Sequence, residues 1–243
     1  HHFLWYYQEI LWRRKELGGD HRELNRTWWE WNRFLSHRYR NPLSIAFAFV
    51  ATHNHFILDR GGKVFKQSAP VIKLPAEATE AEHLSLIGLL NSSTACFWGR
   101  QTFFPKGGYG SGKWEERLEW DGTKLQKFPI PKDRPLELAQ KLDRLAQQLS
   151  NLSPAKLLQN IHNDFANQLN QAKQQWQDTL GAMIALQEEL DWQCYQLYGL
   201  LDQTLTHPAP PNLKLGERAF EIVLARKMAL GEITSSWFER HNS

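Results

Sequence analysis

The chain has little cysteine and no long apolar run. Its 243 residues include two cysteines, Cys96 and Cys194, which are far apart and form no pair with metal-ligand spacing. We therefore expect two free thiols in a reducing compartment. No 18-residue apolar stretch occurs, which argues against a membrane-spanning helix. No basic, apolar and small-residue leader opens the chain, so we expect a cytoplasmic protein.

The motifs of common enzyme classes are also missing. There is no Gly-x-Ser-x-Gly elbow, no Ser-His-Asp arrangement and no nuclease-type spacing of proline, acidic residues and lysine. The Asn/Asp-Pro-Pro-Tyr/Phe motif, with which adenine methyltransferases hold the flipped base, is absent, as is a glycine-rich strand–turn–helix for a nucleoside cofactor. We expect this chain to contain no catalytic residue, cofactor or metal of its own.

One segment approaches a phosphate-binding P-loop. Gly107 and Gly112-Lys113 have the required spacing, but Trp114 stands where a hydroxyl would hold Mg²⁺. The preceding residues 103–105 do not resemble a buried strand. The segment is therefore expected to be an exposed loop and not a nucleotide site.

Charge is distributed unevenly along the chain, although the net charge is only +3. Residues 1–75 hold 12 Lys and Arg against 6 Asp and Glu, whereas residues 76–243 hold 17 against 20. Such a split indicates that the basic part meets an anionic partner and that the rest is structural or contacts protein.

The element pattern predicts an α+β fold, with a small mixed or antiparallel sheet and flanking helices over 1–132. Capping boxes at Thr27–Glu30 and Thr79–Glu82 begin two of the helices. The expected helices are 3–14, 27–40 and 79–98. The expected strands are 43–50, 55–58, 63–65 and 71–74, with glycines of the turn 59–62 joining the second and third as a hairpin.

Residues 133–243 are expected to be mainly helical. An apolar stripe of leucines at 138, 142, 145 and 149 predicts one helix. A helix-compatible run extends from Ser153-Pro154 to Tyr198, with a break or kink plausible near Gly181. A proline-rich linker at 207–211 precedes a last helix over 217–230, which Gly231 ends.

Two histidines in His53-Asn54-His55 suggest two alternatives. On a strand both rings would face one side, as ligation of a metal by two imidazoles requires. His83 is only a candidate third ligand, so we favour histidines that contact phosphate or a base edge.

Basic side chains occur with aromatic ones at two further places. Arg60, Lys63 and Lys66 belong to the expected hairpin, and Lys106 and Lys113 to the glycine loop, with Trp114 and Trp120 after it. This combination suits phosphate contact and base stacking. Ordinary solvated lysines above an aromatic core would give the same pattern, and the residue types leave both interpretations open.

Several phrases, in order along nearly the whole chain, resemble one family. They are THNHF (52–56), DRGGKVF (59–65), APVIKLP (69–75), LLNSSTACFW (89–98), GTKLQKFP (122–129), ALQEELDW (185–192) and RAFEIVLARKM (218–228). They look like the region after the catalytic domain in adenine-specific DNA methyltransferases of the bacteriophage-exclusion and phage-growth-limitation class, and in fused type IIG restriction-modification enzymes.

This resemblance implies a parent enzyme that uses S-adenosylmethionine to methylate adenine N6, with this chain helping to read double-stranded DNA. The catalytic domain would lie N-terminal in the same protein or be supplied in trans, and other defence-system subunits could bind. The alternative is a non-catalytic scaffold whose acidic, glutamine-rich helices dock a partner subunit. The expected DNA contacts are His53, His55, Arg60, Lys63, Lys66, Lys106, Lys113, Trp114, Trp120 and Lys124.

Overall fold

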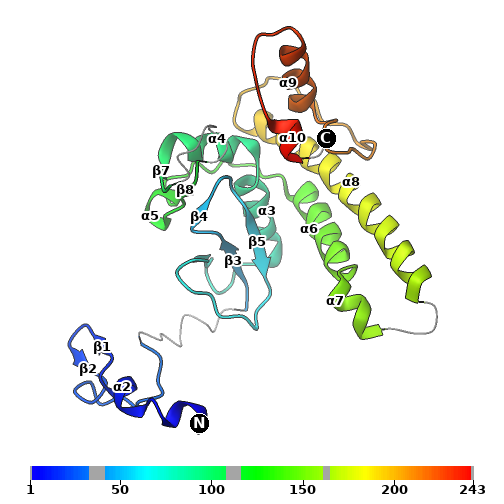
Figure 1. Cartoon of the computed structure of the whole chain (residues 1–243). Coiled ribbons are helices and arrows are strands. Elements are labelled where there is room, and N and C mark those ends of the chain that lie inside the picture. The colour runs from blue at the N-terminus through cyan, green and yellow to red at the C-terminus, as the bar shows by residue number, and fades with distance from the viewer. Residues whose placement is uncertain (1, 33–41, 108–115, 161–164, 242–243) are drawn as a thin grey trace. The chain divides into compact units, whose positions relative to one another are not determined.

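The structure is a computed structural model that describes residues 2–32, 42–107, 116–160 and 165–241 (Figure 1). The chain divides into two compact units, His1–Pro42 and Leu43–Ser243. Small antiparallel sheets combine with helices, which confirms the α+β class. Residues on both sides of position 132, where the two expected domains meet, belong to the second unit.

The first unit is small and built from short elements. These are α1 (His2–Trp5), α2 (Gln8–Trp12), β1 (Lys15–Glu16) and β2 (Gly19–Asp20). A turn closed by the Tyr7 N–H and the Leu4 carbonyl (3.0 Å) divides the single helix expected over 3–14. Trp28 and His21 are buried, and the His21 ring bonds Asn32 and the Thr27 carbonyl.

The helix expected from Thr27 is wrong where the structure describes it. The Glu30 carboxylate accepts a hydrogen bond from the Thr27 N–H (3.0 Å), but the Thr27 hydroxyl has no hydrogen-bond partner. Only half of the capping box therefore forms, and residues 28–30 make a turn. The remainder of this expected helix, 33–41, lies outside the described residues.

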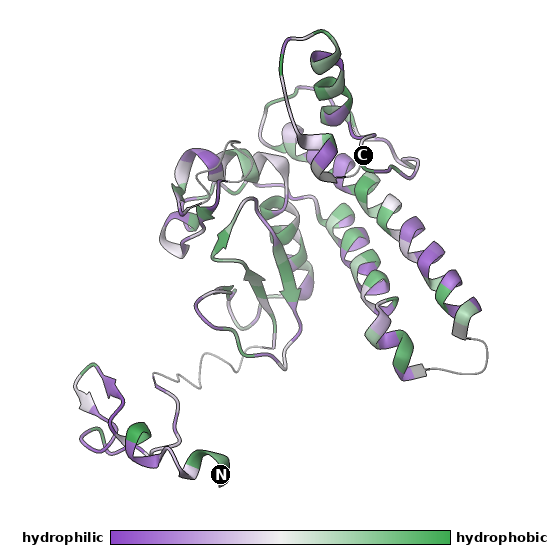
Figure 2. Ribbon diagram, viewed as in Figure 1, coloured by the Kyte–Doolittle hydropathy of each residue, from purple (hydrophilic) through white to green (hydrophobic). Residues whose placement is uncertain are grey.

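The second unit contains two three-stranded antiparallel sheets. One has the order β5-β3-β6 and the other β4-β8-β7. Their strands are β3 (Ser44–Phe47), β4 (Val50–Ala51), β5 (Phe56–Asp59), β6 (Val71–Ile72), β7 (Phe104–Pro105) and β8 (Leu118–Glu119). All four residues of β3 are buried, as expected for a central strand. Figure 2 shows the apolar character of β3 and β5.

Two strand predictions need correction. The strand expected over 43–50 is divided between the two sheets, because the Phe49 N–H and carbonyl bond Ser68 and Trp120 and no longer belong to the β3 ladder. The return strand expected at 63–65 does not form. Gly61 and Gly62 turn the chain with φ of 97° and 77°, but β5 pairs with the earlier strand β3, from Ser44↔Asp59 to Phe47↔Phe56.

The helix expected over 79–98 is two helices. The Thr79 capping box forms and begins α3 (Glu80–Leu90), and Ser92 then caps α4 (Ser93–Thr102) through the Ala95 N–H. Residues 91–92 interrupt the run because the Ser92 hydroxyl serves as a new N-cap. α5 (Gly122–Leu125) follows β8 and is capped by Asp121.

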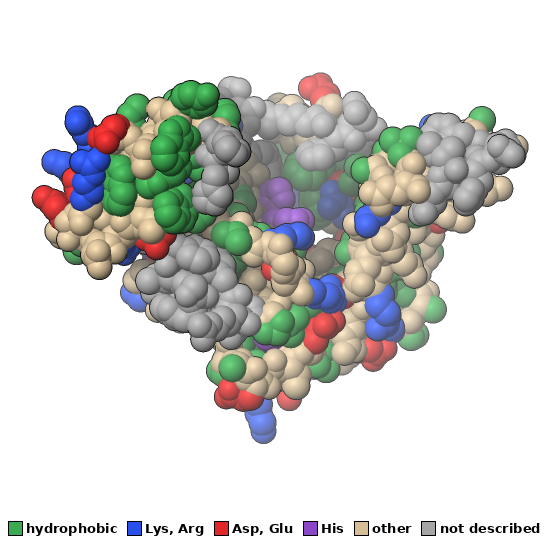
Figure 3. All heavy atoms as spheres, turned by 90° about the horizontal axis from the view of Figure 1, so that it is seen from below, with side chains coloured by type: hydrophobic (Ala, Val, Ile, Leu, Met, Phe, Trp, Pro, Cys, Tyr) green, Lys and Arg blue, Asp and Glu red, His purple; other side chains and the backbone are tan. Residues whose placement is uncertain are grey.

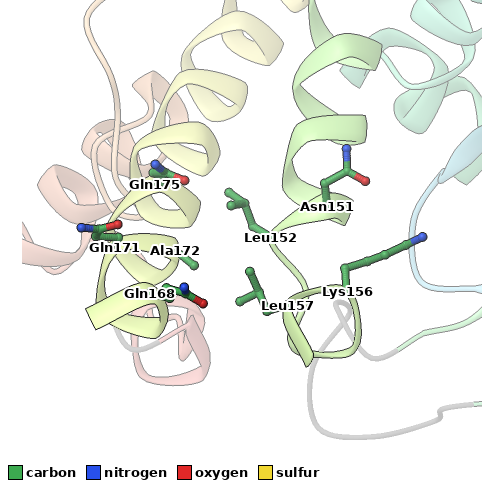
Figure 4. A pocket seen from close by; sticks show the side chains of 8 residues that line it. All are labelled: Asn151, Leu152, Lys156, Leu157, Gln168, Gln171, Ala172 and Gln175. Carbon is green, nitrogen blue, oxygen red and sulfur yellow. The ribbon is translucent and has the colours of Figure 1, made fainter. Parts of the chain in front are cut away.

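Helices α6 (Leu136–Asn151) and α8 (Phe165–Leu197) lie side by side, and α6 also packs on α3 (Figure 1). The leucines of the predicted α6 stripe are all partly buried, which confirms it. α7 (Pro154–Leu157) and a 3-10 helix (Leu158–Asn160) interrupt the long run predicted from 154 to 198. A hollow of about 280 Å³ lies between this part of the chain and α8. Figure 4 shows that Leu152 and Leu157 point toward α8.

The helix break considered near Gly181 does not occur, because α8 continues through this residue. A Cβ there would lie 3.3 Å from both the Asn212 Cβ and the Leu213 carbonyl oxygen. The Leu213 N–H also donates to the Gly181 carbonyl (3.2 Å). Glycine is thus needed because the extended segment after α8 crosses the helix at this point.

The C-terminal part contains α9 (Ala219–Ala229) and α10 (Trp237–His241). Gly231 ends α9 as predicted, with φ of 70°. The Gly231 and Glu232 N–H groups donate to the carbonyls of Met228 and Lys227, which is a Schellman motif.

The main core lies in the second unit, between the sheets and α3, α4 and α8. Its most buried side chains are Ile45, Leu89, Leu118, Trp120, Leu190 and Cys194. Both cysteines are free thiols, as expected. Among the described residues, no helix has the length and apolar character needed to cross a bilayer.

Candidate nucleic-acid interface

The glycine-rich segment joins the two strands of an antiparallel hairpin, β7–β8. Pro105 pairs with Leu118, and beyond them the Lys106 N–H donates to the Arg117 carbonyl (2.6 Å). The Arg117 N–H donates to the Gly107 carbonyl (3.2 Å). Among the described residues, irregular chain at 116–117 and then strand β8 follow the glycine-rich segment, whereas a P-loop is followed by a helix.

The two faces of this hairpin differ in chemistry. Side chains alternate across a strand, so Phe104, Lys106, Arg117 and Glu119 share one face. Phe104 is 70% exposed, and Arg117 is also exposed. We call this face the hairpin surface. It presents one aromatic ring, two cations and one carboxylate at the base of the glycine loop.

Trp120 belongs to the opposite, buried face, which corrects the prediction that it approaches DNA bases. Its side chain is 2% exposed, and its ring lies 4.6 Å from that of Phe103 and 6.0 Å from that of Phe56. Gly99 permits this packing, because a Cβ there would lie 2.7 Å from the Trp120 ring. A base cannot stack on a ring enclosed in this way.

Lys106 and Lys124 both adjoin the hairpin surface. The Lys106 ammonium forms an ion pair with Glu119 (2.7 Å), and its side chain is 55% exposed. The Lys124 ammonium lies 3.2 Å from the centre of the Phe104 ring, a cation–π contact. The structure thus brings these two predicted residues together, along with Phe104 and Arg117, which the sequence analysis missed. Lys113 and Trp114 lie outside the described residues.

The alternation of apolar and polar residues after the glycine loop could have revealed Arg117. Leu118 and Trp120 are apolar at alternate positions after the glycine loop, which indicates a strand with Arg117 and Glu119 on its polar face.

Arg60 has a structural environment different from the one predicted. Its guanidinium bonds Glu80 at the start of α3 (2.7 Å) and Asp143 on α6 (2.6 Å). These hydrogen bonds, with Glu80 the larger contribution, raise the pKa of Arg60 above its usual value. Its charge is therefore largely compensated within the chain.

Lys63 and Lys66 are exposed but lie away from the hairpin surface. Lys63 is 3.7 Å from Asp59. Both belong to the segment that follows β5, in which Arg60 bonds Glu80 at the N-terminal end of α3. The hairpin lies beside α4, which follows the other end of α3 (Figure 1). An 11-residue helix is about 16 Å long, so the predicted residues form two separate groups.

His53 and His55 lie in an irregular segment before β5 and not on a strand. Their rings are 6.4 Å apart in an edge-on arrangement, and the Thr52 hydroxyl lies 3.0 Å from His53 Nδ1. Partial burial, and then the charges of His55 and Arg100, lower the pKa of His53. In the described part of the chain, no three His, Cys, Asp or Glu side chains are placed to hold a metal.

The described residues do not fit a nucleoside cofactor either. None of their glycine-rich turns lies between a strand and a following helix, as cofactor binding in such enzymes would require. The turns at Gly61-Gly62 and Gly107 lead to irregular chain and to β8 respectively.

The LLNSSTACFW phrase forms a structural junction in the second unit. Asn54 donates to the carbonyls of Leu90 and Ser92 (2.7 and 2.9 Å), and the Asp191 carboxylate accepts from the Ser93 N–H (2.7 Å). The Ser93 hydroxyl bonds the Tyr195 hydroxyl (2.8 Å). This phrase therefore connects the segment before β5 with α4 and α8.

Comparison with known proteins gives two matches. Residues 183–243 match a family described as a domain of unknown function, DUF7008. The chain is 46% identical over 257 aligned residues to adenine-specific methyltransferase PglX of Streptomyces coelicolor. The alignment covers 99% of this chain and 21% of that protein, its C-terminal fifth.

Proposed function

We propose that the chain is a DNA-contacting C-terminal segment of an adenine-specific (N6) DNA methyltransferase of a phage-defence or restriction-modification system in the cytoplasm. The single observation that carries this proposal is the hairpin surface, where exposed Phe104, Lys106 and Arg117 surround the base of a glycine-rich loop. Cations bind phosphates, and an exposed ring provides a stacking platform.

The similarity to PglX supports the enzyme class of the parent protein. The chain spans about a fifth of that relative, so methylation and S-adenosylmethionine binding are assigned to the rest of the parent. The absence of catalytic and cofactor motifs from the sequence agrees with this division.

Within this function, Lys106 and Arg117 would position the DNA backbone, and Phe104 would contact a base or sugar. The Lys124 ammonium is buried beneath the Phe104 ring, so it would support that ring and would not contact phosphate. Lys113 and Trp114 of the glycine loop keep their predicted role. Secondary phosphate contacts, away from the hairpin surface, would come from the polar segment with His53 and His55 and from the cations Lys63 and Lys66. Arg60 is assigned to folding.

A salt titration on a 30-base-pair duplex tests this proposal. Replacing both Lys106 and Arg117 by Ala should remove two phosphate contacts and reduce the log–log salt slope by about two. The matched control is Lys141→Ala, which removes a cation of α6 from its pair with Glu137 and should leave the slope unchanged. An unchanged slope in the folded double variant would exclude the hairpin surface from DNA binding.

The scaffold alternative has one observation in its favour. The helix α9 exposes Phe220, Ile222 and Val223, which are 44%, 41% and 50% exposed. Figure 3 shows further hydrophobic side chains gathered on the surface of the first unit, at the left of the view. If the chain binds no DNA at low salt but binds a partner subunit, the scaffold function replaces the proposed one.

A further inference from the structure

A groove runs along the free edge of strand β5. Its volume is about 740 Å³, and it is bounded by β5, α3, α6 and α8 of the second unit. Since β5 is the outer strand of its sheet, its second edge faces this groove. The groove is therefore lined on one side by the backbone of a strand.

Alternation of hydrogen bonds shows which backbone groups face the groove. The Phe56 N–H donates to the Asn91 side chain and not to β3, and the Phe47 N–H donates to Pro70 on the opposite side of β3. In an antiparallel pair, the backbone N–H and carbonyl groups of every second residue point away from the neighbouring strand. The Leu58 N–H and carbonyl therefore point into the groove, and they make no hydrogen bond within the described part of the chain.

The other walls are mainly apolar, and the charges in the groove already have partners. The Arg60 guanidinium pairs with Asp143 (2.6 Å), and the Lys63 ammonium lies 3.7 Å from Asp59. A charged ligand would have to compete with these pairs. The larger apolar side chains of these walls are Leu84, Ile87, Leu142, Met183 and Leu190.

We propose that this groove binds an extended, uncharged peptide segment of a partner protein, with apolar side chains at alternate positions. The segment adds to β5 as a further strand and pairs with the backbone of Leu58. Its alternate side chains lie against the apolar walls. Asn91 limits the pairing, because it already occupies the backbone groups of Phe56.

The test uses the full chain and a fluorescein-labelled heptapeptide of alternating threonine and valine, measured by fluorescence anisotropy. Leu58→Pro removes the N–H that faces the groove, and the matched control Leu58→Ala removes the same side chain but keeps that N–H. We expect Leu58→Ala to bind within about threefold of the unmodified chain. Leu58→Pro should bind at least tenfold more weakly, about 1.4 kcal/mol.

A second measurement covers the case in which Leu58→Pro does not fold. Two N-methylated forms of the peptide are titrated on the unmodified chain, with methyl groups on alternate residues of one register or the other. Pairing along one edge requires that one form loses binding and that the other retains it. Equal loss or equal retention would overturn strand addition.

Other outcomes also decide the proposal. Absence of binding at about 1 mM peptide, or equal affinities of the two Leu58 variants, would overturn it. Self-association of the chain that Leu58→Pro abolishes, measured by analytical ultracentrifugation, would assign the groove to a second copy and so overturn the proposed occupant.

Discussion

The side-chain amide of Asn91 replaces a neighbouring strand for Phe56. It accepts a hydrogen bond from the Phe56 N–H and donates one to the Phe56 carbonyl, each at 2.8 Å. The two residues are 35 positions apart, so this pair ties the edge of β5 to the end of α3. The Gln187 amide of α8 then donates to the Asn91 carbonyl (3.2 Å).

Asn91→Ala should lower the free energy of unfolding by about 2–3 kcal/mol, because a backbone donor and acceptor in a partly buried place both lose their partner. Urea denaturation measures the change. Asn151→Ala, at an exposed position of α6, is the control and should cost less than about 0.5 kcal/mol. Equal effects of the two variants would contradict the role given to Asn91.

Gly88→Ala should destabilise the second unit by about 1–3 kcal/mol, although alanine is the better helix former. A Cβ at this position would lie 3.0 Å from the Ala139 Cβ, 3.1 Å from Pro135 and 3.4 Å from Leu190. Gly122→Ala is the control, since a Cβ there meets no atom within 4 Å. Thermal melting compares both variants, and a Gly88→Ala protein as stable as the control would show that the helices can separate without cost.

Asp191→Asn should make the chain more stable at pH 7.5 and remove part of its pH dependence. Partial burial raises the pKa of Asp191 to about 6, against the hydrogen bond from the Ser93 N–H. A raised pKa of an acid stabilises the fold at low pH, and this contribution is lost as the pH rises from about 4 through 6. The free energy of unfolding of the variant, relative to that of the unmodified chain, should therefore rise by about 2–3 kcal/mol between pH 4 and 7.5. Urea denaturation measures this difference. If the difference in unfolding free energy between the variant and the unmodified chain stayed constant across this pH range, the raised pKa of Asp191 would be refuted.

Glu221→Gln should destabilise the α9–α10 region by about 3 kcal/mol at pH 7. The carboxylate is fully buried and accepts hydrogen bonds from Arg218, Gly216 and the Trp237 indole. Burial by itself raises the pKa of Glu221, but the hydrogen bonds from Arg218 and Trp237 outweigh it and lower the pKa to about 2.

A lowered pKa stabilises the fold above about pH 4.5, and this contribution is lost as the pH falls toward 2. The difference between Glu221→Gln and the unmodified chain should therefore shrink in acid. Hydrogen exchange of the α9 backbone amides measures this difference in local stability. The control is Glu232→Gln, at an exposed position. Unchanged exchange rates in Glu221→Gln at pH 7 would show that this carboxylate does not hold α9 in place.

Features that depend on neighbours a few positions apart could be predicted from the amino-acid sequence. The capping box of Thr79 and Glu82, the leucine stripe of α6 and the helix end at Gly231 all form as predicted. Their hydrogen bonds and contacts join residues three to five positions apart, so a short window of sequence contains every group involved.

The roles of Trp120 and Arg60 depend instead on partners that are distant in sequence. Trp120 is a core residue because Phe56, Gly99 and Phe103 enclose its ring, and Arg60 serves folding because Asp143, 83 positions away, is within 2.6 Å. An arginine or a tryptophan near a glycine-rich turn suits nucleic-acid contact and a structural role equally well. Only the chain's path, which brings distant partners together or leaves a side chain exposed, selects between these roles.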